Sequence, residues 1–344
     1  MKAVVIHEHG DPEVLKEEEY PTPQLGPEDV LVKVKACGVN QADLMIRRGD
    51  VRMYPKLPHI LGSEISGVVH SVGSAVTQWK GGERVIVYPG FGCGHCEFCV
   101  KGHLYSCNTY KYFGTQMQGT YSEFVKAPWY NMVPLPEEVS FVEGAAIPMV
   151  MLTSWHMVVD QANVRPGEIV LVHAAGSGIG SASIQIAKLC GATVIATAGS
   201  DDKEELARSL GASHFINYRK TDFREEVGKI TNKRGVDVVI EHTGEFTWDK
   251  SVRSLVKHGR LVVCGATSGH NGYTDIRYVY YKHLNIIGST LGTIENLKHA
   301  LQYVAAGRIR TVVDRVYPIS EVRKAHEIME ARQNKGKQVL QMWD

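Results

Sequence analysis

The hydrophobic pattern changes character about halfway along the chain. Up to about residue 150, short runs of β-type residues such as VLVKVKACGV and RVIVYPG are interrupted by Gly and Pro. From about residue 165, apolar runs of four to six residues alternate with segments of helical period, as in GEIVLVHAAGSGIG followed by SASIQIAKLCG. This alternation is typical of βαβ units around a parallel sheet. The sequence therefore predicts an irregular β region followed by an α/β domain with a parallel sheet.

The pattern returns to strands near the C-terminus. After IIGSTLG (287–292), the stretch ENLKHALQYVAAG has a helical period, whereas TVVDRVYPI and KQVLQMWD read as strands. We expect this last part to rejoin the first domain, so that residues 1–150 and 292–344 form one domain and residues 151–291 the other. Two domains also suit a length of 344 residues, which is more than one hydrophobic core usually serves.

Composition narrows the class of partner. A net charge of +1, with 44% hydrophobic and 22% charged residues, is typical of a globular protein. Binding to nucleic acid or an acidic membrane needs a clustered basic face, which the sequence lacks. The N-terminal stretch has no apolar core of a secretion signal, and no segment approaches the roughly 20 apolar residues that span a bilayer. We therefore expect a cytoplasmic protein that acts on a small molecule.

Four of the seven cysteines lie close together in the sequence. Cys93, Cys96, Cys99 and Cys107 have the spacing C-x2-C-x2-C-x7-C, and four thiolates suit tetrahedral zinc. Such a site has no open position for water or substrate, so the predicted zinc is structural.

Other interpretations of this cysteine loop are open. An iron–sulfur site would place the last cysteine closer and follow it with proline, but Asn108 follows here. Disulfides are less compatible with the cytoplasm. His95 and His103 are additional candidates for a ligand position.

The stretch VLVHAAGSGIGSASIQIAKLCGA predicts a strand, a turn of small residues and a helix, which is the context of a dinucleotide site. Its glycines depart from the G-x-G-x-x-G spacing, because with Gly180 in the third place the first two hold Ala175 and Ser177. An ordinary αβ turn is the alternative. The candidate cofactor contacts in the turn are Gly176, Ser177, Gly178 and Ile179.

The end of the next predicted strand favours NADP(H) over NAD(H). An NAD site carries Asp or Glu there to bind the ribose 2′-hydroxyl, but this chain has Ala198, Gly199 and Ser200, with Lys203 one turn later. Without a carboxylate to repel it, a 2′-phosphate can bind Ser200 and Lys203. The alternative for Lys203 is a solvated residue beside two aspartates.

Several motifs together resemble the medium-chain dehydrogenase/reductase superfamily over the whole chain. They are C-G-V-N at 37–40, G-x-E-x-x-G at 62–67, the cysteine loop, QGTYSEFV at 118–125 and the strand-turn-helix at 169–190. The resemblance implies a GroES-like β domain, a Rossmann domain with a doubly wound parallel sheet and an active site in the cleft between them. It also implies a homodimer or homotetramer formed through the edge of the Rossmann sheet.

Alcohol dehydrogenases of this superfamily hold a second, catalytic zinc with a Cys, a His and a third Cys or acidic residue. Cys37 matches the first position, but Ser63 stands in place of the histidine and Met149 in the third position. Serine and a thioether are poor zinc ligands, although Glu64 remains available as a second ligand. The resemblance therefore predicts a site without catalytic zinc.

Loss of a Lewis acid restricts the substrate to one that accepts hydride readily, such as a quinone, an enone or an enoyl thioester. The residues Asn40 and Asp43, followed by R-x-G at 47–49, resemble the N-x-x-D…R-x-G pattern of zinc-independent quinone oxidoreductases and enoyl reductases. Tyr218 lies in a stretch, 216–219, that resembles the part of those reductases near the adenosine 2′-phosphate. Thr153, Thr243 and Gly265 are further candidate cofactor contacts.

Among these residues we predict Asn40, Ser63 and Thr153 as hydrogen-bond donors to the substrate carbonyl, with Asp43 orienting them. The alternatives are that Asn40 caps a helix, that Asp43 pairs with Arg47, and that Thr153 touches only the cofactor. No general acid can be named. Isolated histidines, namely His59, His156 and His242, are expected in the core.

The sequence thus predicts an NADPH-dependent reductase of quinones or conjugated enone or enoyl substrates, with NADP(H) and one structural zinc ion per chain. One alternative is an alcohol dehydrogenase or aldehyde reductase that rebuilds its catalytic zinc site from Cys37, Glu64 and a neighbour such as His59. Another is a non-catalytic relative that binds the cofactor.

Overall fold

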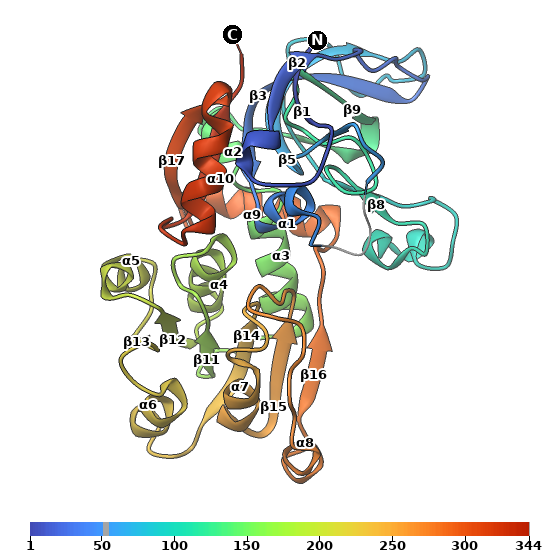
Figure 1. Ribbon diagram of the computed structural model, residues 1–344. Helices are drawn as coiled ribbons and strands as arrows, with labels where there is room; N and C mark the ends of the chain where they lie inside the picture. The colour runs from blue at the N-terminus through green and yellow to red at the C-terminus, as the bar shows by residue number, and fades with distance from the viewer. Residues whose placement is uncertain (51–54, 344) are drawn as a thin grey trace. The chain divides into compact units, whose positions relative to one another are not determined.

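The computed structural model describes residues 1–50 and 55–343. It divides into two compact units (Figure 1), one formed by residues 1–149 and 293–344 and the other by residues 150–292. The first unit is discontinuous in sequence because the C-terminal strand β18 (Lys337–Gln341) pairs antiparallel with β3 (Asp29–Val39), which places Leu340 opposite Cys37. The C-terminal residues therefore complete a sheet that the N-terminal residues begin.

The first unit is mainly β structure. Its largest sheet has the order β10-β6-β5-β3-β18-β17, with β9 also paired to β3, and a second sheet has the order β2-β1-β4. The remaining strands of this unit are β1 (Lys2–Ile6), β2 (Lys16–Glu19), β4 (His59–Ile60), β5 (Glu64–Val72), β6 (Arg84–Val87), β7 (Gly90–Phe91), β8 (Lys111–Tyr112), β9 (Phe124–Pro128), β10 (Met132–Pro134) and β17 (Val313–Pro318). Aliphatic side chains from these strands form one continuous buried core.

The described residues of the first unit form the α-helices α1 (Gln41–Arg48), α2 (Phe141–Gly144), α9 (Ile294–Ala305) and α10 (Val322–Glu330). Helix α1 follows β3 directly. It begins at Asn40, whose backbone N–H donates to the Asp43 carboxylate over 2.8 Å, and it ends at Gly49 with a φ of +82°, a conformation that glycine adopts without strain. These local signals hold two candidate site residues at the first turn of the helix.

The second unit is a doubly wound α/β domain. Its six strands are all parallel and have the order β13-β12-β11-β14-β15-β16. The strands β11 to β13 are added toward one edge of the sheet and β14 to β16 toward the other, so the order of addition reverses between β11 and β14. The bounds are β11 (Ile169–Val172), β12 (Thr193–Ala198), β13 (His214–Asn217), β14 (Val236–Glu241), β15 (Leu255–Val263) and β16 (Asn285–Gly288). This confirms the predicted doubly wound sheet, and ligands of such sheets bind at the carboxyl ends of the strands beside the reversal.

Helices connect these strands on both sides of the sheet. They are α4 (Gly178–Leu189), α5 (Glu204–Ser209), α6 (Phe223–Ile230), α7 (Trp248–Ser254) and α8 (Ile276–Tyr281), whereas α3 (Val150–Trp155), continued by a π-helix (His156–Gln161), precedes the first strand. Strands β11 and β14 are almost entirely buried and aliphatic, which explains why they read as continuous apolar runs in the sequence.

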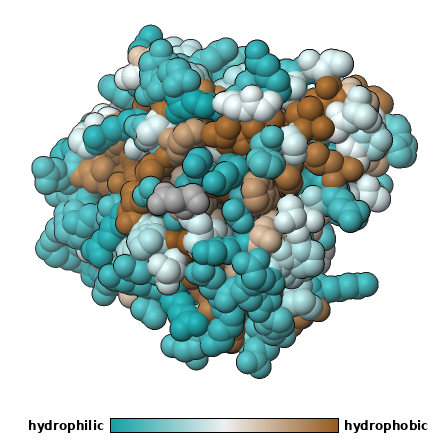
Figure 2. Space-filling model, turned by 90° about the horizontal axis from the view of Figure 1, so that it is seen from above, coloured by the Kyte–Doolittle hydropathy of each residue, from teal (hydrophilic) through white to brown (hydrophobic). Residues whose placement is uncertain are grey.

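The surface is that of a folded globular chain. On the face in Figure 2, hydrophilic side chains cover much of the area and hydrophobic side chains gather in bands between them. In the described part of the chain, no helix combines the length and the apolar character needed to cross a bilayer.

Candidate functional site

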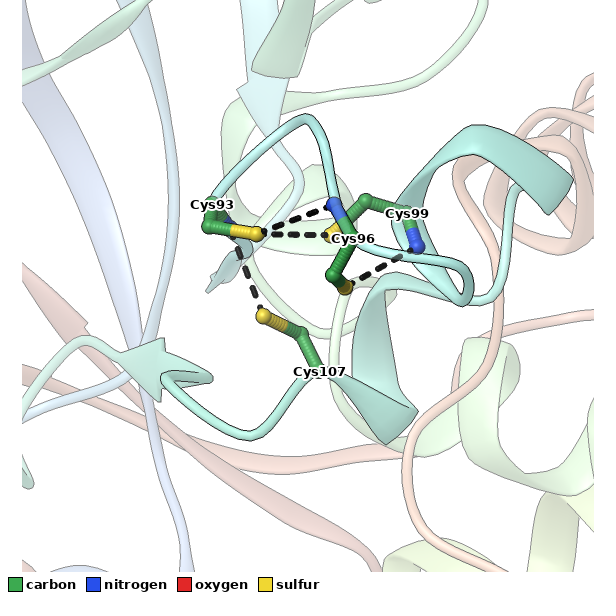
Figure 3. Close-up of side chains that lie close together, drawn as sticks. All are labelled: Cys93, Cys96, Cys99 and Cys107. Carbon is green, nitrogen blue, oxygen red and sulfur yellow. Dashed lines mark hydrogen bonds between the residues drawn. The ribbon is translucent and has the colours of Figure 1, made fainter.

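The four cysteines of the predicted zinc loop converge in the first unit (Figure 3). Their sulfur atoms all lie within 4.8 Å of one another, and the Sγ atoms of Cys93 and Cys99 are 3.9 Å apart. Tetrahedral zinc with Zn–S bonds of about 2.3 Å needs sulfurs roughly 3.8 Å apart. The donor set therefore fits one zinc ion with a closed coordination sphere.

Backbone N–H groups support these sulfurs. The N–H groups of Cys96, Cys99 and Cys93 donate to the sulfurs of Cys93, Cys96 and Cys107, over 3.3, 3.5 and 3.4 Å. Hydrogen bonds lower the pKa of Cys107 to about 6, first of all the bond from Thr109. At Cys107 this environment favours the thiolate form that a metal requires, whereas burial raises the pKa of Cys99 to about 12.

The two histidines of the loop turn away from the sulfurs. His95 Nδ1 lies 2.8 Å from the carbonyl oxygen of Cys93, and His103 Nδ1 lies 2.9 Å from the Tyr105 hydroxyl. Neither belongs to the group of converging ligands among the described residues. They do not take ligand positions in this arrangement.

The predicted cofactor turn joins β11 to α4 in the second unit. Ser177 caps α4, because its hydroxyl oxygen accepts the Gly180 N–H over 2.9 Å. A Cβ on Gly180 would lie 2.2 Å from the carbonyl oxygen of Ala174, so the helix and strand approach too closely for a side chain there. This is the role that the third glycine has in dinucleotide turns. The free N–H groups of a twelve-residue helix thus point toward the edge where a phosphate group can bind.

The ends of β12 and β13 gather the residues predicted to bind the 2′-phosphate. The Tyr218 hydroxyl lies 2.8 Å from where a Cβ on Gly199 would stand, and the Lys203 side chain lies 2.6 Å from the corresponding point on Gly176. Asp201, one of two neighbouring aspartates after the end of β12, accepts from Asn217 over 2.6 Å and pairs with Lys220. These two partners lower the pKa of Asp201, and its negative charge is balanced.

A cavity of about 230 Å³ lies next to Tyr218. The Tyr218 ring meets the Phe246 ring edge-on with centroids 5.5 Å apart. The Arg219 side chain also lines the cavity, and sequence reasoning quoted Arg219 in the 216–219 stretch without giving it a role. The cavity therefore combines aromatic and cationic groups at the carboxyl edge of the sheet.

The other predicted cofactor contacts lie at this edge too. Ser154, the neighbour of Thr153 on α3, donates its hydroxyl to the Ile179 carbonyl in the first turn of α4 over 3.3 Å. Thr243 follows β14, and a Cβ on Gly265 would lie 3.3 Å from the carbonyl oxygen of His242. Thr153, Thr243 and Gly265 thus belong to the second unit, whereas Asn40, Asp43 and Ser63 belong to the first.

Cys37, the remaining match to a catalytic zinc ligand, is fully buried in the first unit. Its sulfur lies 3.0 Å from the Thr120 hydroxyl, and burial raises the pKa of the thiol well above its usual value. Across residues 1–50 and 55–343, the four cysteines of the zinc loop are the one group of three or more convergent His, Cys, Asp or Glu ligands. Cys37, Glu64 and His59 do not form such a group.

Glu64 forms an ion pair with Lys337, a residue that the sequence did not identify as part of the site. The Lys337 ammonium forms a buried ion pair with Glu64, donates to the Asn40 side-chain oxygen over 2.6 Å and donates to the Val39 carbonyl over 2.9 Å. The second Glu64 oxygen accepts the Met149 N–H over 2.8 Å. Three donors of the ammonium meet three acceptors, and both carboxylate oxygens are engaged.

Asn40 connects this ion pair to Ser63. Its amide nitrogen donates to Glu64 over 2.9 Å and to the Ser63 hydroxyl oxygen over 3.2 Å. Because Lys337 donates to the Asn40 oxygen, the orientation of the amide is fixed. Ser63 therefore accepts a hydrogen bond from Asn40, and its own hydroxyl proton has no acceptor among the described residues.

Asp43 contributes to the same cluster through the hydrogen bonds that its carboxylate accepts. Its carboxylate accepts from the backbone N–H groups of Asn40 and Gly62, over 2.8 and 3.2 Å, and from the Tyr121 hydroxyl over 3.1 Å. Asn40 is thus the N-cap of α1, as the alternative interpretation proposed. The alternative partner for Asp43 is wrong, because Arg47 pairs with Glu330 on α10 instead.

Asp43 also gives a pH dependence of stability. Burial raises its pKa from 3.8 to about 6, so the folded state binds this proton more tightly than the unfolded chain does. The contribution of Asp43 to stability is full below pH 4 and is lost as pH rises through about 6, by up to about 3 kcal/mol. We expect the unfolding free energy of the Asp43→Asn variant, measured in urea between pH 4 and 7, to lack this decline. Parallel curves for both proteins would contradict the assignment.

Comparison with known proteins matches both units. Residues 26–137 match the family model of the alcohol dehydrogenase GroES-like domain, and residues 178–306 match that of zinc-binding dehydrogenases. An alcohol dehydrogenase of Geobacillus stearothermophilus is 33% identical, with 99% of this chain and 100% of that protein aligned. A quinone oxidoreductase of Homo sapiens is 31% identical, covering 99% and 97%. The crystal structure of an NAD-dependent alcohol dehydrogenase superposes with a TM-score of 0.95 at 42% identity, covering 99% of both chains.

Proposed function

Because the chain belongs to the medium-chain dehydrogenase/reductase superfamily of oxidoreductases, we propose that it is an NADPH-dependent reductase of quinones or conjugated enone or enoyl substrates that works without a catalytic zinc. The observation that carries the proposal is the buried Lys337 ammonium, which engages Glu64, the acidic residue beside Cys37 that remained available as a second zinc ligand. Zinc binding at Cys37 with Glu64 would require two cations to share one carboxylate, which is unfavourable in a buried site.

The cluster offers hydrogen-bond donors where a zinc enzyme offers a Lewis acid. Ser63 is the proposed donor to the substrate carbonyl, since it accepts from Asn40 and its own proton is available. Asn40 is held by Lys337 and Asp43, so the donor is oriented before substrate binds. NADPH supplies the hydride when bound, and conjugation lets the reduced substrate spread its charge onto the oxygen that Ser63 holds. Thr153 is proposed to contact the cofactor or the carbonyl.

The proposed cofactor contacts are the turn at Gly176, Ser177, Gly178 and Ile179, together with Ser200, Lys203, Tyr218, Thr243 and Gly265. The gathering of Lys203 and Tyr218 at strand ends that lack an unpaired carboxylate supports NADPH over NADH. The four cysteines of the loop are proposed to hold the single zinc ion of each chain.

The proposal is tested by NADPH oxidation against a panel of quinones, enones, enoyl thioesters and aldehydes, with zinc measured on the same sample. We expect turnover of at least one activated acceptor, no turnover of simple aldehydes, and one zinc ion per chain. Two zinc ions per chain with aldehyde reduction would establish the alcohol dehydrogenase instead. NADPH binding without any turnover would establish a non-catalytic relative.

The alcohol dehydrogenase remains a second candidate for a specific reason. The solved structure of an NAD-dependent alcohol dehydrogenase is 42% identical to this chain, and Cys37 keeps one ligand of a catalytic zinc. Against it, Ser63 and Met149 stand where the other two ligands would be, and the Met149 N–H is bonded to Glu64. The panel experiment separates the two candidates.

Cofactor preference is tested with Lys203→Met. Methionine keeps an aliphatic chain over Gly176 but removes the ammonium. We expect KM for NADPH to rise about 10- to 100-fold, the value of a charge-assisted hydrogen bond, while KM for NADH changes little. Lys188→Met, on the far end of α4, serves as the control. An equal effect on both cofactors would show that Lys203 does not bind the 2′-phosphate.

A homodimer or homotetramer is proposed from the exposed edge of the second unit. Tyr280, Tyr281 and Ile286 are all at least 40% exposed, on α8 and on the edge strand β16. An edge strand flanked by exposed apolar side chains pairs readily with a second copy. The test is sedimentation of the Ile286→Lys variant beside the parent protein. A monomeric variant and an oligomeric parent would support this interface, whereas an unchanged oligomer would exclude it.

A further inference from the structure

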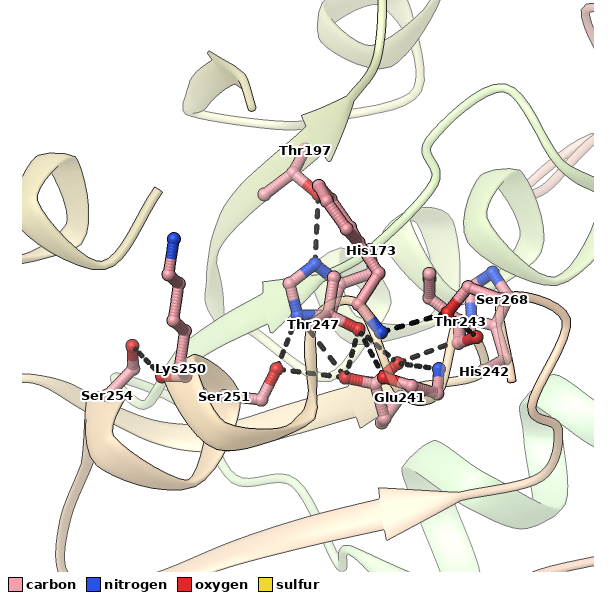
Figure 4. A network of polar contacts seen from close by, with 12 residues as sticks. His173, Thr197, Glu241, His242, Thr243, Thr247, Lys250, Ser251, Ser254 and Ser268 are labelled. Carbon is pink, nitrogen blue, oxygen red and sulfur yellow. Dashed lines mark hydrogen bonds and ion pairs between the residues drawn. The ribbon is translucent and has the colours of Figure 1, made fainter. Parts of the chain in front are cut away.

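A chain of buried polar groups crosses the carboxyl edge of the parallel sheet (Figure 4). His173 follows β11, and its ring joins the Thr197 hydroxyl of β12, 2.9 Å from Nδ1, to the Ser251 hydroxyl of α7, 2.8 Å from Nε2. Ser251 in turn donates to Glu241, the last residue of β14, over 2.9 Å. Both His173 and Glu241 are completely shielded from solvent.

Chemistry fixes the direction of these hydrogen bonds. An ionised carboxylate only accepts hydrogen bonds, so Ser251 donates its one hydroxyl proton to Glu241. Ser251 must therefore accept a hydrogen bond from His173. His173 therefore carries its proton on Nε2, and Nδ1 accepts from Thr197. Burial lowers the pKa of His173, consistent with this neutral ring. One directional chain thus connects β12, β11, α7 and β14.

Glu241 also fixes the loop after β14. Its oxygens accept from the N–H groups of Thr243 and Gly244, over 2.8 and 3.1 Å, and from the Thr247 hydroxyl over 2.9 Å. Burial raises the pKa of Glu241, but the hydrogen bonds that its oxygens accept outweigh burial and leave the pKa lowered. The carboxylate is therefore charged and holds the loop that carries Thr243.

A second link ties this loop to the cofactor turn. His242 Nε2 lies 3.1 Å from the Ser177 hydroxyl, and Ser177 caps α4. The loop after β14 and the start of α4 are thereby joined by side chains, on the two sides of the point where the sheet reverses direction.

We propose that His173 and Glu241 are positioning residues, which set the spacing of the strand ends and the loop that form the nicotinamide-cofactor site without touching the cofactor. The inference rests on the proposed function for the identity of the ligand. The buried residues that precede His173 in β11 and Glu241 in β14 are all aliphatic, and a buried polar network contributes little stability compared with aliphatic packing. We therefore attribute this network at the ligand-binding edge to the need to hold the strand ends and the loop in fixed positions, and not to a gain in stability.

The test compares His173→Leu with Thr231→Val. Thr231 is a buried hydroxyl in the same unit that accepts from Gly235 and donates to Val227, in the loop leading into β14 at the opposite end of that strand. We expect His173→Leu to raise the Kd for NADPH about 2- to 30-fold and also to lower Tm, because the buried Thr197 and Ser251 hydroxyls lose their partner. Thr231→Val is expected to lower Tm and leave Kd unchanged. His173→Gln, whose amide can still donate to Ser251, should recover part of the affinity.

A second measurement does not depend on the cofactor. Hydrogen exchange of the backbone amides at 174–180 and 243–244 should accelerate in His173→Leu and in Glu241→Gln, but not in Thr231→Val. If wild-type protein binds no NADPH, the proposed function fails while the exchange pattern still decides the positioning role. Unchanged exchange at both segments in the two variants, or a Kd shift equal in Thr231→Val, would overturn the inference.

Discussion

Replacing Lys337 with methionine is expected to destabilise the first unit strongly and to lower activity at the same time. It would leave the Glu64 carboxylate buried without its ammonium partner, and breaking a buried pair in this way typically costs about 3–5 kcal/mol of stability. The Asn40 oxygen would also lose its donor, so the amide would no longer be held toward Ser63. We expect a matching loss in the unfolding free energy measured in urea, and a fall in kcat of about tenfold or more in whatever protein remains folded.

Two further variants separate charge from packing. Lys337→Met combined with Glu64→Leu removes both charges and should recover much of the lost stability but not the activity, since Asn40 would still be unsupported. Lys337→Met combined with Ser63→His frees Glu64 and restores the histidine position, and should bind a second zinc ion. If Lys337→Met alone kept both its stability and its kcat, the cluster would not be the centre that we propose.

Removing one sulfur from the cysteine loop is expected to release the metal. Cys107→Ser leaves three thiolates, and structural zinc contributes its binding free energy directly to folding, on the order of 10 kcal/mol in small domains. We expect less than about a tenth of the parent zinc content and a loss of about 5 kcal/mol or more in stability of the first unit. Protein that stays folded should keep its kcat, because a closed site performs no chemistry.

Cys190→Ser, which changes a cysteine outside the loop in the second unit, is the matched control and should keep both zinc and stability. Full zinc occupancy in Cys107→Ser would show that the ion is bound elsewhere. If kcat fell in Cys107→Ser and recovered when zinc was added back, with no change in folding, the metal would take part in catalysis.

The sequence alone determined the features that depend on short spacing. The cysteines at 93, 96, 99 and 107 converge because a loop of fifteen residues can bring them together on its own. The strand, turn and helix around Ser177 follow from a local apolar run, small residues and a helical period. The parallel sheet follows from the alternation of such units, since parallel strands need a crossover helix each time.

Only the tertiary structure decided how the two polar clusters are built. Asn40 and Lys337 are 297 positions apart, and no local pattern distinguishes Lys337 from any other lysine of a C-terminal strand. The register of β18 on β3 brings it to Glu64. His173 and Glu241 likewise lie at the ends of two apolar runs that are far apart in the sequence. They become neighbours because β11 and β14 are adjacent in the sheet. Contacts of this kind depend on which strands pair and in which register, and that is set by burial of the whole core rather than by neighbouring residues in the chain.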